Sequence, residues 1–375
     1  GFFDRLEFPF GTLKPGETKQ WSVERKLPLA LSERADLVEF EVHSDTNIEE
    51  QGSSTIAEIS AETPPLLTYS YHFDDRKGGN GDGLIQVGEQ VDFIIDVKNL
   101  GKTAAKDAFV TVRNSGGSEV FLKVGRASLG EIAAGKSKRA SLNFEVKGNT
   151  GVSAAKLQLS VWDGEFATGF SDELEIAFGE AKQIQKVRGV VESKVDVTVY
   201  SGASAATNPL GTLKSGARVR ATMKTGGFTR VVLGKDAFGF IDSNALKSAK
   251  KLRKKLGFKR QPGQEPPRIG LSLPALITED SALNLEIQVS DRDSLRDMYI
   301  FVNDQKVFFT KLGDAVRGKD GETVVLRPKI PLEEGTNEIG LVVRESDTLM
   351  GRRSFAIYRK PIKLGTAKPA ELRSQ

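Results

Sequence analysis

Apolar and polar residues alternate along much of this chain with the period of two that is typical of a half-buried β-strand. In VDFIIDVK, residues 91–98, every second side chain is apolar, and residues 156–161 and 283–289 repeat the pattern. Groups rich in turn-forming residues (NLGK, NSGG, KPGE, EEGT) separate such stretches at short intervals. This succession of short strands and turns predicts an all-β fold built from sandwiches or barrels.

One stretch of this pattern occurs twice. GTLKPGETKQWSVERKL, which begins at Gly11, aligns with GEIAAGKSKRASLNFEV, which begins at Gly130. Each copy has a short strand, a glycine-bearing turn and then an alternating strand. Strand-rich sequence precedes the second copy, whereas only a short segment precedes the first. We therefore predict that residues 1–63 are the C-terminal part of an immunoglobulin-like sandwich whose opening strands lie upstream.

Changes in composition divide the rest of the chain. Pro64-Pro65 marks the start of a second module, and a polar bridge (GEAKQIQKVRG) precedes a compact group of short strands. The predicted modules are an immunoglobulin-like sandwich over 64–180, an SH3-like barrel over 188–248, a basic and Pro-rich linker over 249–267, an immunoglobulin-like sandwich over 268–362 and a mobile tail over 363–375. The predicted fold class is all-β, with immunoglobulin-like β-sandwiches in tandem with a small SH3-like barrel.

Composition excludes several kinds of chemistry. Among 375 residues there is no cysteine, which excludes disulfides, thiolate metal sites and cysteine nucleophiles. No segment approaches the roughly 18 consecutive apolar residues of a membrane span. The net charge is only +4, from 54 basic and 50 acidic residues, and this balance does not favour a nucleic-acid partner. The sequence starts at GFFDRLEF without a signal pattern, so we expect a fragment or a processed product.

The residues also lack a recognisable catalytic constellation. His43 and His72 are the two histidines, and neither belongs to a zinc-binding pattern. In TYSYHFDD, the alternation predicts that Tyr69, Tyr71 and Phe73 face the core and that His72 lies on the surface. No phosphate-binding or dinucleotide-binding glycine motif is present. A Ser–Lys dyad stays open, because serines and lysines are abundant, but no pair in the sequence demands one.

The segment DDRKGGNGDGLIQVGEQ, residues 74–90, resembles a calcium-binding loop in its spacing. Asn80, Asp82 and Glu89 occupy the third, fifth and twelfth positions of the D-x-[DN]-x-[DN]-G-x₅-E pattern. The first position is Gly78, which offers no side-chain oxygen, so Asp75 or Asp74 would have to replace it. The predicted ligands of a structural calcium ion are Asp75, Asn80, Asp82 and Glu89. The alternative is a hairpin whose glycines supply positive φ angles.

Three further segments have alternative interpretations. The run KSAKKLRKKLGFKR, residues 247–260, carries eight basic residues and no acid. We expect a solvated connector helix there, with Leu252 and Leu256 on one face. An acidic partner surface, anionic lipid or nucleic acid is the alternative. The apolar run 298–302 predicts a strand buried on both faces. Asp291 and Asp293 are either a second calcium-binding pair or part of a turn.

Several motifs together resemble one family. NGDGLIQVGE, VDFIIDVKNLG and VGRASLGEI resemble the sandwich that follows the peptidase core in large exported carboxyl-terminal processing (tail-specific) serine peptidases of bacteria. FFDRLEFPFGTLKPGETKQW resembles the preceding domain of these proteins. LRDMYIFVNDQKVFF and PLEEGTNEIGLVVRES resemble their terminal β-domain. The resemblance covers nearly the whole chain, in the same order of segments.

The resemblance implies a parent serine endopeptidase with a Ser–Lys dyad and a PDZ domain, both upstream. No segment matches the peptidase core, so no catalytic residue is assigned, and the chain would be a non-catalytic region that positions the enzyme, its substrates or assembly partners. Its partners would be the upstream peptidase and PDZ region and protein substrates or envelope components. Its location would be periplasmic, outer-membrane-associated or extracellular. The alternatives are an independent surface adhesin or cell-wall-binding protein, and a processed fragment that stays bound to its peptidase.

Overall fold

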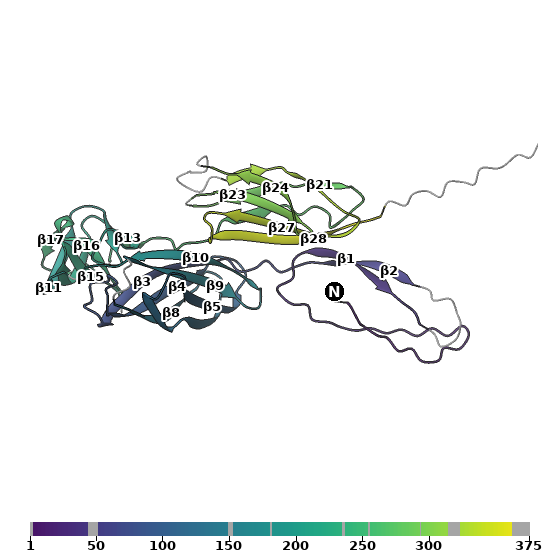
Figure 1. Ribbon diagram of the computed structural model, residues 1–375, viewed down its shortest axis with the longest axis horizontal. Coiled ribbons are helices and arrows are strands. Elements are labelled where there is room, and N and C mark those ends of the chain that lie inside the picture. Colours follow the sequence, from purple (N-terminus) through teal and green to yellow (C-terminus); the bar gives the residue numbers. More distant parts are fainter. Residues whose placement is uncertain are drawn as a thin grey trace, which may run out of the picture. The chain divides into compact units, whose positions relative to one another are not determined.

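The computed structural model describes residues 3–43, 52–148, 153–180, 182–234, 237–253, 256–292, 294–313 and 323–361. The chain is nearly all β, and its one described helical element is a 3₁₀ turn, Ser243–Ala245. Its strands form two compact units (Figure 1). The central unit is Thr63–Pro266, and the terminal unit combines Gly1–Glu62 with Pro267–Gln375. No described helix is long and apolar enough to cross a membrane.

The first half of the central unit contains two four-stranded antiparallel sheets (Figure 1). One has the order β3-β4-β8-β6 and the other the order β10-β9-β5-β7. The strands of the first sheet are β3 (Leu67–Gly78), β4 (Gln90–Asn99), β8 (Ser137–Val146) and β6 (Val120–Val124). Those of the second are β10 (Thr168–Ala177), β9 (Ala154–Asp163), β5 (Ala105–Asn114) and β7 (Arg126–Ile132).

The alternation seen in the sequence explains how these two sheets pack. Val91, Phe93 and Ile95 of β4 are fully buried, whereas the residues between them are only partly buried. The rings of Phe73 and Phe93 lie 4.8 Å apart, which adds aromatic contact to the buried apolar area. The hydroxyl of Tyr69 on β3 donates to Asp172 on β10, so the buried phenol has a polar partner in the other sheet.

The second half of the central unit is one eight-stranded sheet with the order β17-β11-β14-β15-β16-β12-β13-β18. Its strands are β11 (Ile184–Ser193), β12 (Val197–Tyr200), β13 (Pro209–Leu213), β14 (Arg218–Thr225), β15 (Phe228–Gly234), β16 (Ala237–Asp242), β17 (Leu246–Ala249) and β18 (Phe258–Arg260). It encloses a core that includes Val199, Leu213, Val219 and Ile241. No hydrogen bonds between β17 and β18 close the sheet within the described residues, so the SH3-like barrel stays a prediction.

The prediction of a connector helix within residues 247–260 is wrong. Among the described residues of this run, Leu246–Ala249 and Phe258–Arg260 are strands, and β18 pairs with β13. Leu256 packs against the core of the sheet, whereas Leu252 is 47% exposed. The two leucines therefore do not form one apolar helix face, and the free edge of β13 provides hydrogen bonds for an extended segment instead.

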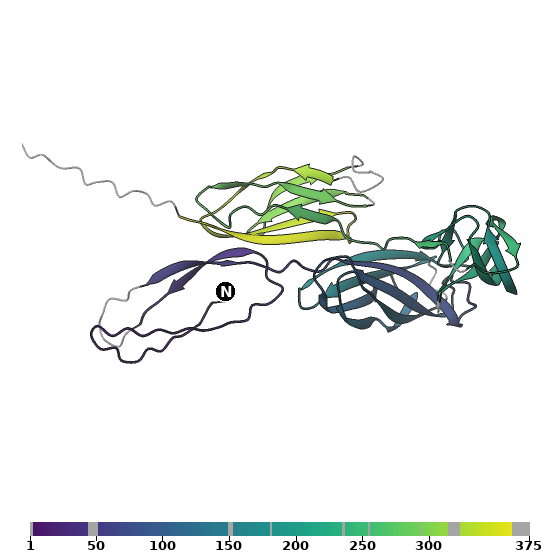
Figure 2. The same cartoon turned by 180° about the vertical axis from the view of Figure 1, so that it is seen from behind.

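The terminal unit contains a sheet with the order β2-β1-β28-β27-β23-β24, and β20 also pairs with β28. Figure 2 shows this unit from behind, with β28 in yellow. Its strands are β1 (Arg34–Phe40), β2 (Ser53–Ile59), β20 (Ile277–Thr278), β23 (Asp297–Val302), β24 (Gln305–Lys311), β27 (Gly335–Arg344) and β28 (Met350–Arg359). Two small sheets complete the unit: β19 (Arg268–Leu271) with β22 (Ile287–Ser290) and β25 (Thr323–Leu326), and β21 (Ala282–Asn284) with β26 (Lys329–Pro331).

Residues 298–302 form a strand as predicted, but the predicted burial on both faces holds for one face only. β23 lies between β27 and β24, and Met298, Ile300 and Val302 are buried. The residues between them, Tyr299 and Phe301, are half-buried. Burial is therefore complete on one face of β23 and partial on the other, and the continuous apolar run does not distinguish the two faces.

The N-terminal segment joins the terminal unit through strand pairing. β1 pairs with β28 in parallel, with Arg34 opposite Ala356, and the Ala356 N–H donates to Glu33 O at 2.9 Å. The sequence prediction instead treats residues 1–63 and 268–362 as separate domains. Residues 3–33 contain no strand, although the alternating repeat predicts one, and Trp21 is 52% exposed. The predicted tail, 363–375, lies outside the described residues.

Candidate functional site

The loop between β3 and β4, residues 79–89, and Asp75 near the end of β3 bring together the four residues predicted to bind calcium. The chain reverses here with Gly81, Gly83 and Gly88 at φ values of +81°, +71° and +85°. Backbone of this kind is accessible to glycine at little cost. The hairpin alternative therefore describes the backbone of the loop correctly, and the side chains show how it is held.

The Asp75 carboxylate is the centre of the loop. Asp75 is only 1% exposed. Its Oδ2 atom accepts hydrogen bonds from the N–H groups of Gly81 (2.8 Å) and Asp82 (3.2 Å), and its Oδ1 atom accepts one from Gly83 (3.1 Å). Three consecutive backbone donors thus converge on one carboxylate. Bonds of this charge-assisted kind are among the strongest in proteins.

Asp82 and Asn80 extend this network with Gln86, a residue that the sequence pattern did not identify. The Oδ1 atom of Asp82 accepts from Leu84 N (2.9 Å), and its Oδ2 atom accepts from Gln86 Nε2 (2.8 Å). Asn80 Oδ1 accepts from Asp82 N, while Asn80 Nδ2 donates to Gln86 Oε1 at 2.7 Å. Asp82 and Gln86 are buried, so these bonds satisfy groups that water does not reach.

Glu89 closes the loop from its far end. Its Oε1 atom accepts from Asn80 N and its Oε2 atom from Gln86 N, both at 3.1 Å. Burial first, and then the charges of Asp75 and Asp82, raise the pKa of Glu89 to about 7, although the two hydrogen bonds act in the opposite direction. Burial also raises the pKa of Asp75. The loop therefore concentrates negative charge that a proton on Glu89 relieves near neutral pH.

This geometry bears on the predicted calcium ion. Every carboxylate oxygen of Asp75, Asp82 and Glu89 accepts a hydrogen bond from the loop itself. No group of three or more acidic or histidine side chains is arranged to hold a metal ion in the part of the chain that the structure describes. A calcium ion would have to take over oxygens that now accept N–H donors, and calcium binding stays a prediction.

The other residues considered as ligands lie elsewhere. Asp74 forms an ion pair with Arg76, at 2.5 Å between Oδ2 and Nη2. Gly78 is opposite Gln90 in the β3–β4 ladder, where an added Cβ would lie 2.5 Å from Gln90 O. Asp291 is buried, and Asp293 lies outside the described residues. Within this loop, only Asp75 supplies the carboxylate that Gly78 lacks.

The loop also contacts the eight-stranded sheet. Ala203 N donates to Asp82 O, and Arg230 Nη1 donates to Gly81 O, each at 2.9 Å. The guanidinium of Arg76 lies 3.7 Å from the centre of the Phe238 ring, a cation–π contact. The loop therefore joins the two halves of the central unit, and we call this contact between residues 79–89 and the eight-stranded sheet the joint. The sequence of the loop does not indicate the contact, because the partners lie more than a hundred residues away.

A substitution at Gly83 tests whether the close approach of the loop to the eight-stranded sheet stabilises the central unit. An added Cβ would lie 2.5 Å from Ser201 O, whereas the same addition at Gly88, also at positive φ, meets nothing within 4 Å. Gly83→Ala should therefore destabilise the central unit by about 1–3 kcal/mol more than Gly88→Ala, because overpacking adds to the shared backbone strain. Urea unfolding followed by tryptophan and circular-dichroism signals measures this difference. Equal destabilisation by the two substitutions would show that the close approach is not needed.

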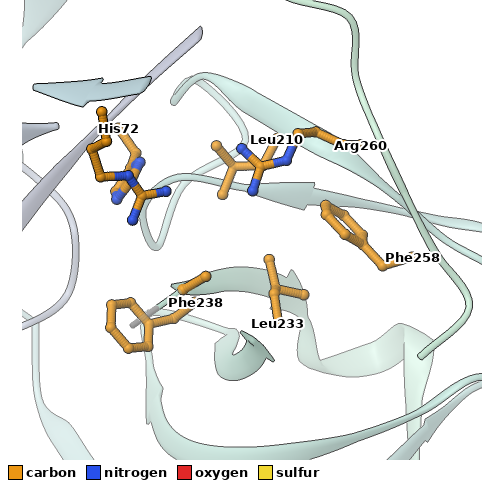
Figure 3. Close-up of a pocket in the computed structure, with 8 residues that line it drawn as sticks. His72, Leu210, Leu233, Phe238, Phe258 and Arg260 are labelled. Atoms are coloured by element: carbon orange, nitrogen blue, oxygen red, sulfur yellow. The ribbon is translucent and has the colours of Figure 1, made fainter. Parts of the chain in front are cut away.

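His72 lies beside a cavity of about 20 Å³ between the two halves of the central unit. Figure 3 shows it near Leu210 and Arg260, with Leu233, Phe238 and Phe258 also around the cavity. Its predicted position on the surface is wrong, because the eight-stranded sheet covers this side of β3 and leaves His72 half-buried. Burial first, and then the charge of Arg139, lower the pKa of His72 to about 4.

Two arginines and one carboxylate line the same region. Arg139 Nε and Nη2 donate to the two carboxylate oxygens of Asp96 at 2.8 and 2.9 Å, and Arg260 Nη1 lies 3.2 Å from Asp96 Oδ2. Arg260 belongs to β18, so this ion pair links the end of the basic run to the β4 strand. The charges of Arg139, Asp96 and Arg260 all act on His72.

The lowered pKa of His72 predicts a pH dependence. The unfolded state binds a proton near pH 6.5 and the folded state only near pH 4. The contribution of His72 to stability is therefore complete above about pH 6.5 and is lost as the pH falls toward 4, at a rate of at most about 1.4 kcal/mol per pH unit. His72→Gln should reduce this slope in urea unfolding, whereas His43→Gln, at an exposed position, should not. Identical slopes in the His72→Gln variant and the wild type would contradict the prediction.

Comparisons with known proteins add little to this picture. No protein-family model matches the chain, and no curated protein matches it. Among solved structures, the chain is similar to the dimeric latent PorU from Porphyromonas gingivalis, at a TM-score of 0.18 and 10% sequence identity. The match covers 82% of this chain and 35% of that one, so this chain spans about a third of its length. A likeness at this score carries no argument about function.

Proposed function

We propose that this chain is a non-catalytic accessory region of an exported carboxyl-terminal processing serine peptidase. The segments that support this assignment by resemblance are residues 2–21, 80–101, 124–132, 295–309 and 331–346. The observation that carries the proposal furthest is the joint, in which the NGDG segment ties the two halves of the central unit together through Asp82 O and Gly81 O. A fixed pair of β-modules is suited to holding a substrate or partner at a set distance from an enzyme.

The finer fold assignments belong to the same proposal. The two four-stranded sheets of residues 64–180 would be an immunoglobulin-like sandwich, and the eight-stranded sheet would be an SH3-like module. Strands β3 and β4, with the loop between them, would be the element shared with other exported β-domains. Catalysis would lie in an upstream peptidase with a Ser–Lys dyad, and the chain itself would act through its surfaces.

A structural calcium ion at Asp75, Asn80, Asp82 and Glu89 is part of this proposal. Support comes from the burial of three carboxylates close together and from the raised pKa of Glu89, which burial raises first and the charges of Asp75 and Asp82 next. Calcium takes six to eight oxygen ligands, so backbone carbonyls or water would complete the shell. The ion would stiffen the joint and would not take part in catalysis.

Thermal unfolding in calcium and in chelator tests the metal proposal. At about a hundredfold excess over Kd, calcium should stabilise the folded state by about 2.7 kcal/mol. The effect should be larger at pH 8 than at pH 6, because a proton on Glu89 competes with the ion. Asp82→Asn should abolish it, whereas Asp92→Asn, a substitution on β4 outside the loop, should not. Equal midpoints in calcium and chelator at pH 8 would exclude the ion.

The reading frame upstream of the Gly1 codon tests the peptidase proposal. A continuous frame that encodes a PDZ domain and a Ser–Lys peptidase is expected, and deletion of residues 63–266 from that protein should lower kcat/KM for protein substrates while sparing short peptides. A stop codon or an unrelated module directly upstream would contradict the proposal. That result would favour the adhesin or cell-wall-binding alternative, for which binding to peptidoglycan sacculi is the direct assay.

A further inference from the structure

The near balance of charge over the whole chain hides a strong local asymmetry. Residues 182–260, which form the eight-stranded sheet and its connections, contain 18 Lys and Arg but only 4 Asp and Glu. The remainder of the chain contains 36 basic and 46 acidic residues. One half of the central unit is therefore strongly basic, although the chain as a whole carries a charge of only +4. Such asymmetry indicates an anionic partner for this module.

Strand pairing assembles part of this charge on one face. In the β17-β11-β14 ladder, Glu192 lies opposite Lys247 on one side and Arg218 on the other. Residues directly opposite each other in a ladder point to the same side of the sheet. Arg220, two positions after Arg218, shares its side and is exposed, whereas Val219 between them is buried.

The chain that leaves β17 adds further cations beside this ladder. Lys250, Lys251 and Arg253 are exposed, and Arg218 Nη1 donates to Lys251 O at 3.4 Å, which holds this segment against β14. We define the basic face by its six cationic residues: Arg218, Arg220, Lys247, Lys250, Lys251 and Arg253. It draws its charge from two strands and one connecting segment, so sequence alone shows only the last part of it.

Glu192 is an acidic residue at the centre of this face, and it is already neutralised. Its Oε1 atom lies 2.9 Å from Lys247 Nζ and its Oε2 atom 2.6 Å from Arg218 Nε. These hydrogen bonds, from Lys247 first and then from Arg218, lower the pKa of Glu192 to about 2. Two cations of the face are thereby fixed in place, while Arg220, Lys250, Lys251 and Arg253 extend around them with a net positive charge.

The apolar side chains near the basic face distinguish between anionic partners. The five aromatic residues within 182–260 are all buried or half-buried, so they form no exposed platform on which bases could stack. They are Tyr200, Phe228, Phe238, Phe240 and Phe258. Leu252, by contrast, is 47% exposed and lies in sequence between Lys251 and Arg253. An exposed leucine flanked by cations suits the interface of a bilayer, where the charges meet headgroups and the leucine enters the acyl boundary.

We propose that the basic face of the eight-stranded sheet binds the surface of a membrane that contains anionic phospholipids, with Leu252 inserted at the interface. Binding would be peripheral and reversible, because the affinity comes from a few lysines and arginines and one apolar side chain. Membrane binding would occur whether or not the chain is part of a peptidase. In a peptidase it would set the orientation of the enzyme on the envelope.

Vesicle co-sedimentation of the full chain tests this proposal. At about 0.15 M salt, where the Debye length is about 8 Å, we expect binding to phosphatidylcholine vesicles that contain phosphatidylglycerol and none to pure phosphatidylcholine. The variant K250E/K251E/R253E should bind about 100-fold more weakly, because each cation near an anionic bilayer contributes roughly a factor of five. Leu252→Ser should weaken vesicle binding without changing the retention of the chain on a heparin column.

A matched control separates the basic face from total charge. K102E/K136E/K156E removes the same charge from exposed positions in the other half of the central unit and should leave vesicle binding unchanged. Equal loss in both triple variants would overturn the proposal, as would equal binding of the wild type to neutral and anionic vesicles. Tighter binding to a DNA duplex than to anionic vesicles at the same salt would also overturn it and assign nucleic acid instead. Should a triple variant unfold, Leu252→Ser decides the question alone, because vesicle binding that is unchanged in this variant would overturn the proposal.

Discussion

The central unit depends on one buried carboxylate. Asp75 ends the core-facing part of β3, and its two oxygens accept the N–H groups of Gly81, Asp82 and Gly83. Three backbone donors would otherwise be buried without partners, which is costly in a protein interior. The carboxylate therefore fixes the path of the loop, and the loop in turn presents Gly81 O and Asp82 O to the eight-stranded sheet.

This arrangement has an electrostatic consequence. Asp75, Asp82 and Glu89 are all buried in one loop, and the raised pKa of Glu89 shows that the third negative charge is unfavourable there. A proton or a bound cation relieves that charge. The same loop can thus be a rigid joint and an ion-sensitive one, because the groups that hold it together are also the groups that a cation would bind.

The sequence predicted local features of the chain well and contacts between distant segments poorly. Strand alternation identified β4 and β9, and a continuous apolar run identified β23, since burial leaves a direct trace in the order of residues. The spacing in residues 74–90 identified Asp75, Asn80, Asp82 and Glu89, which the structure brings into one loop. Gln86 was missed, because the D-x-[DN]-x-[DN]-G-x₅-E pattern leaves that position unspecified.

The predictions that failed depended on partners far away in the sequence. His72 was expected on the surface because its neighbours on β3 face the core, but a second sheet covers it. Residues 258–260 become a strand because β13 offers an edge, not because of their own propensity. The parallel pairing of β1 with β28 joins residues more than three hundred positions apart, and the alternation within either strand does not specify its partner.

Native-state hydrogen exchange across the central unit tests the role of Asp75 most directly. If its carboxylate fixes the joint, the amides of Gly81 and Gly83 should be protected and should open with the same free energy as Val219 in the core of the eight-stranded sheet. Asp75→Asn should lower both protections together. Exchange of Gly81 and Gly83 at the rate of an unstructured peptide, while Val219 stays protected, would contradict this account.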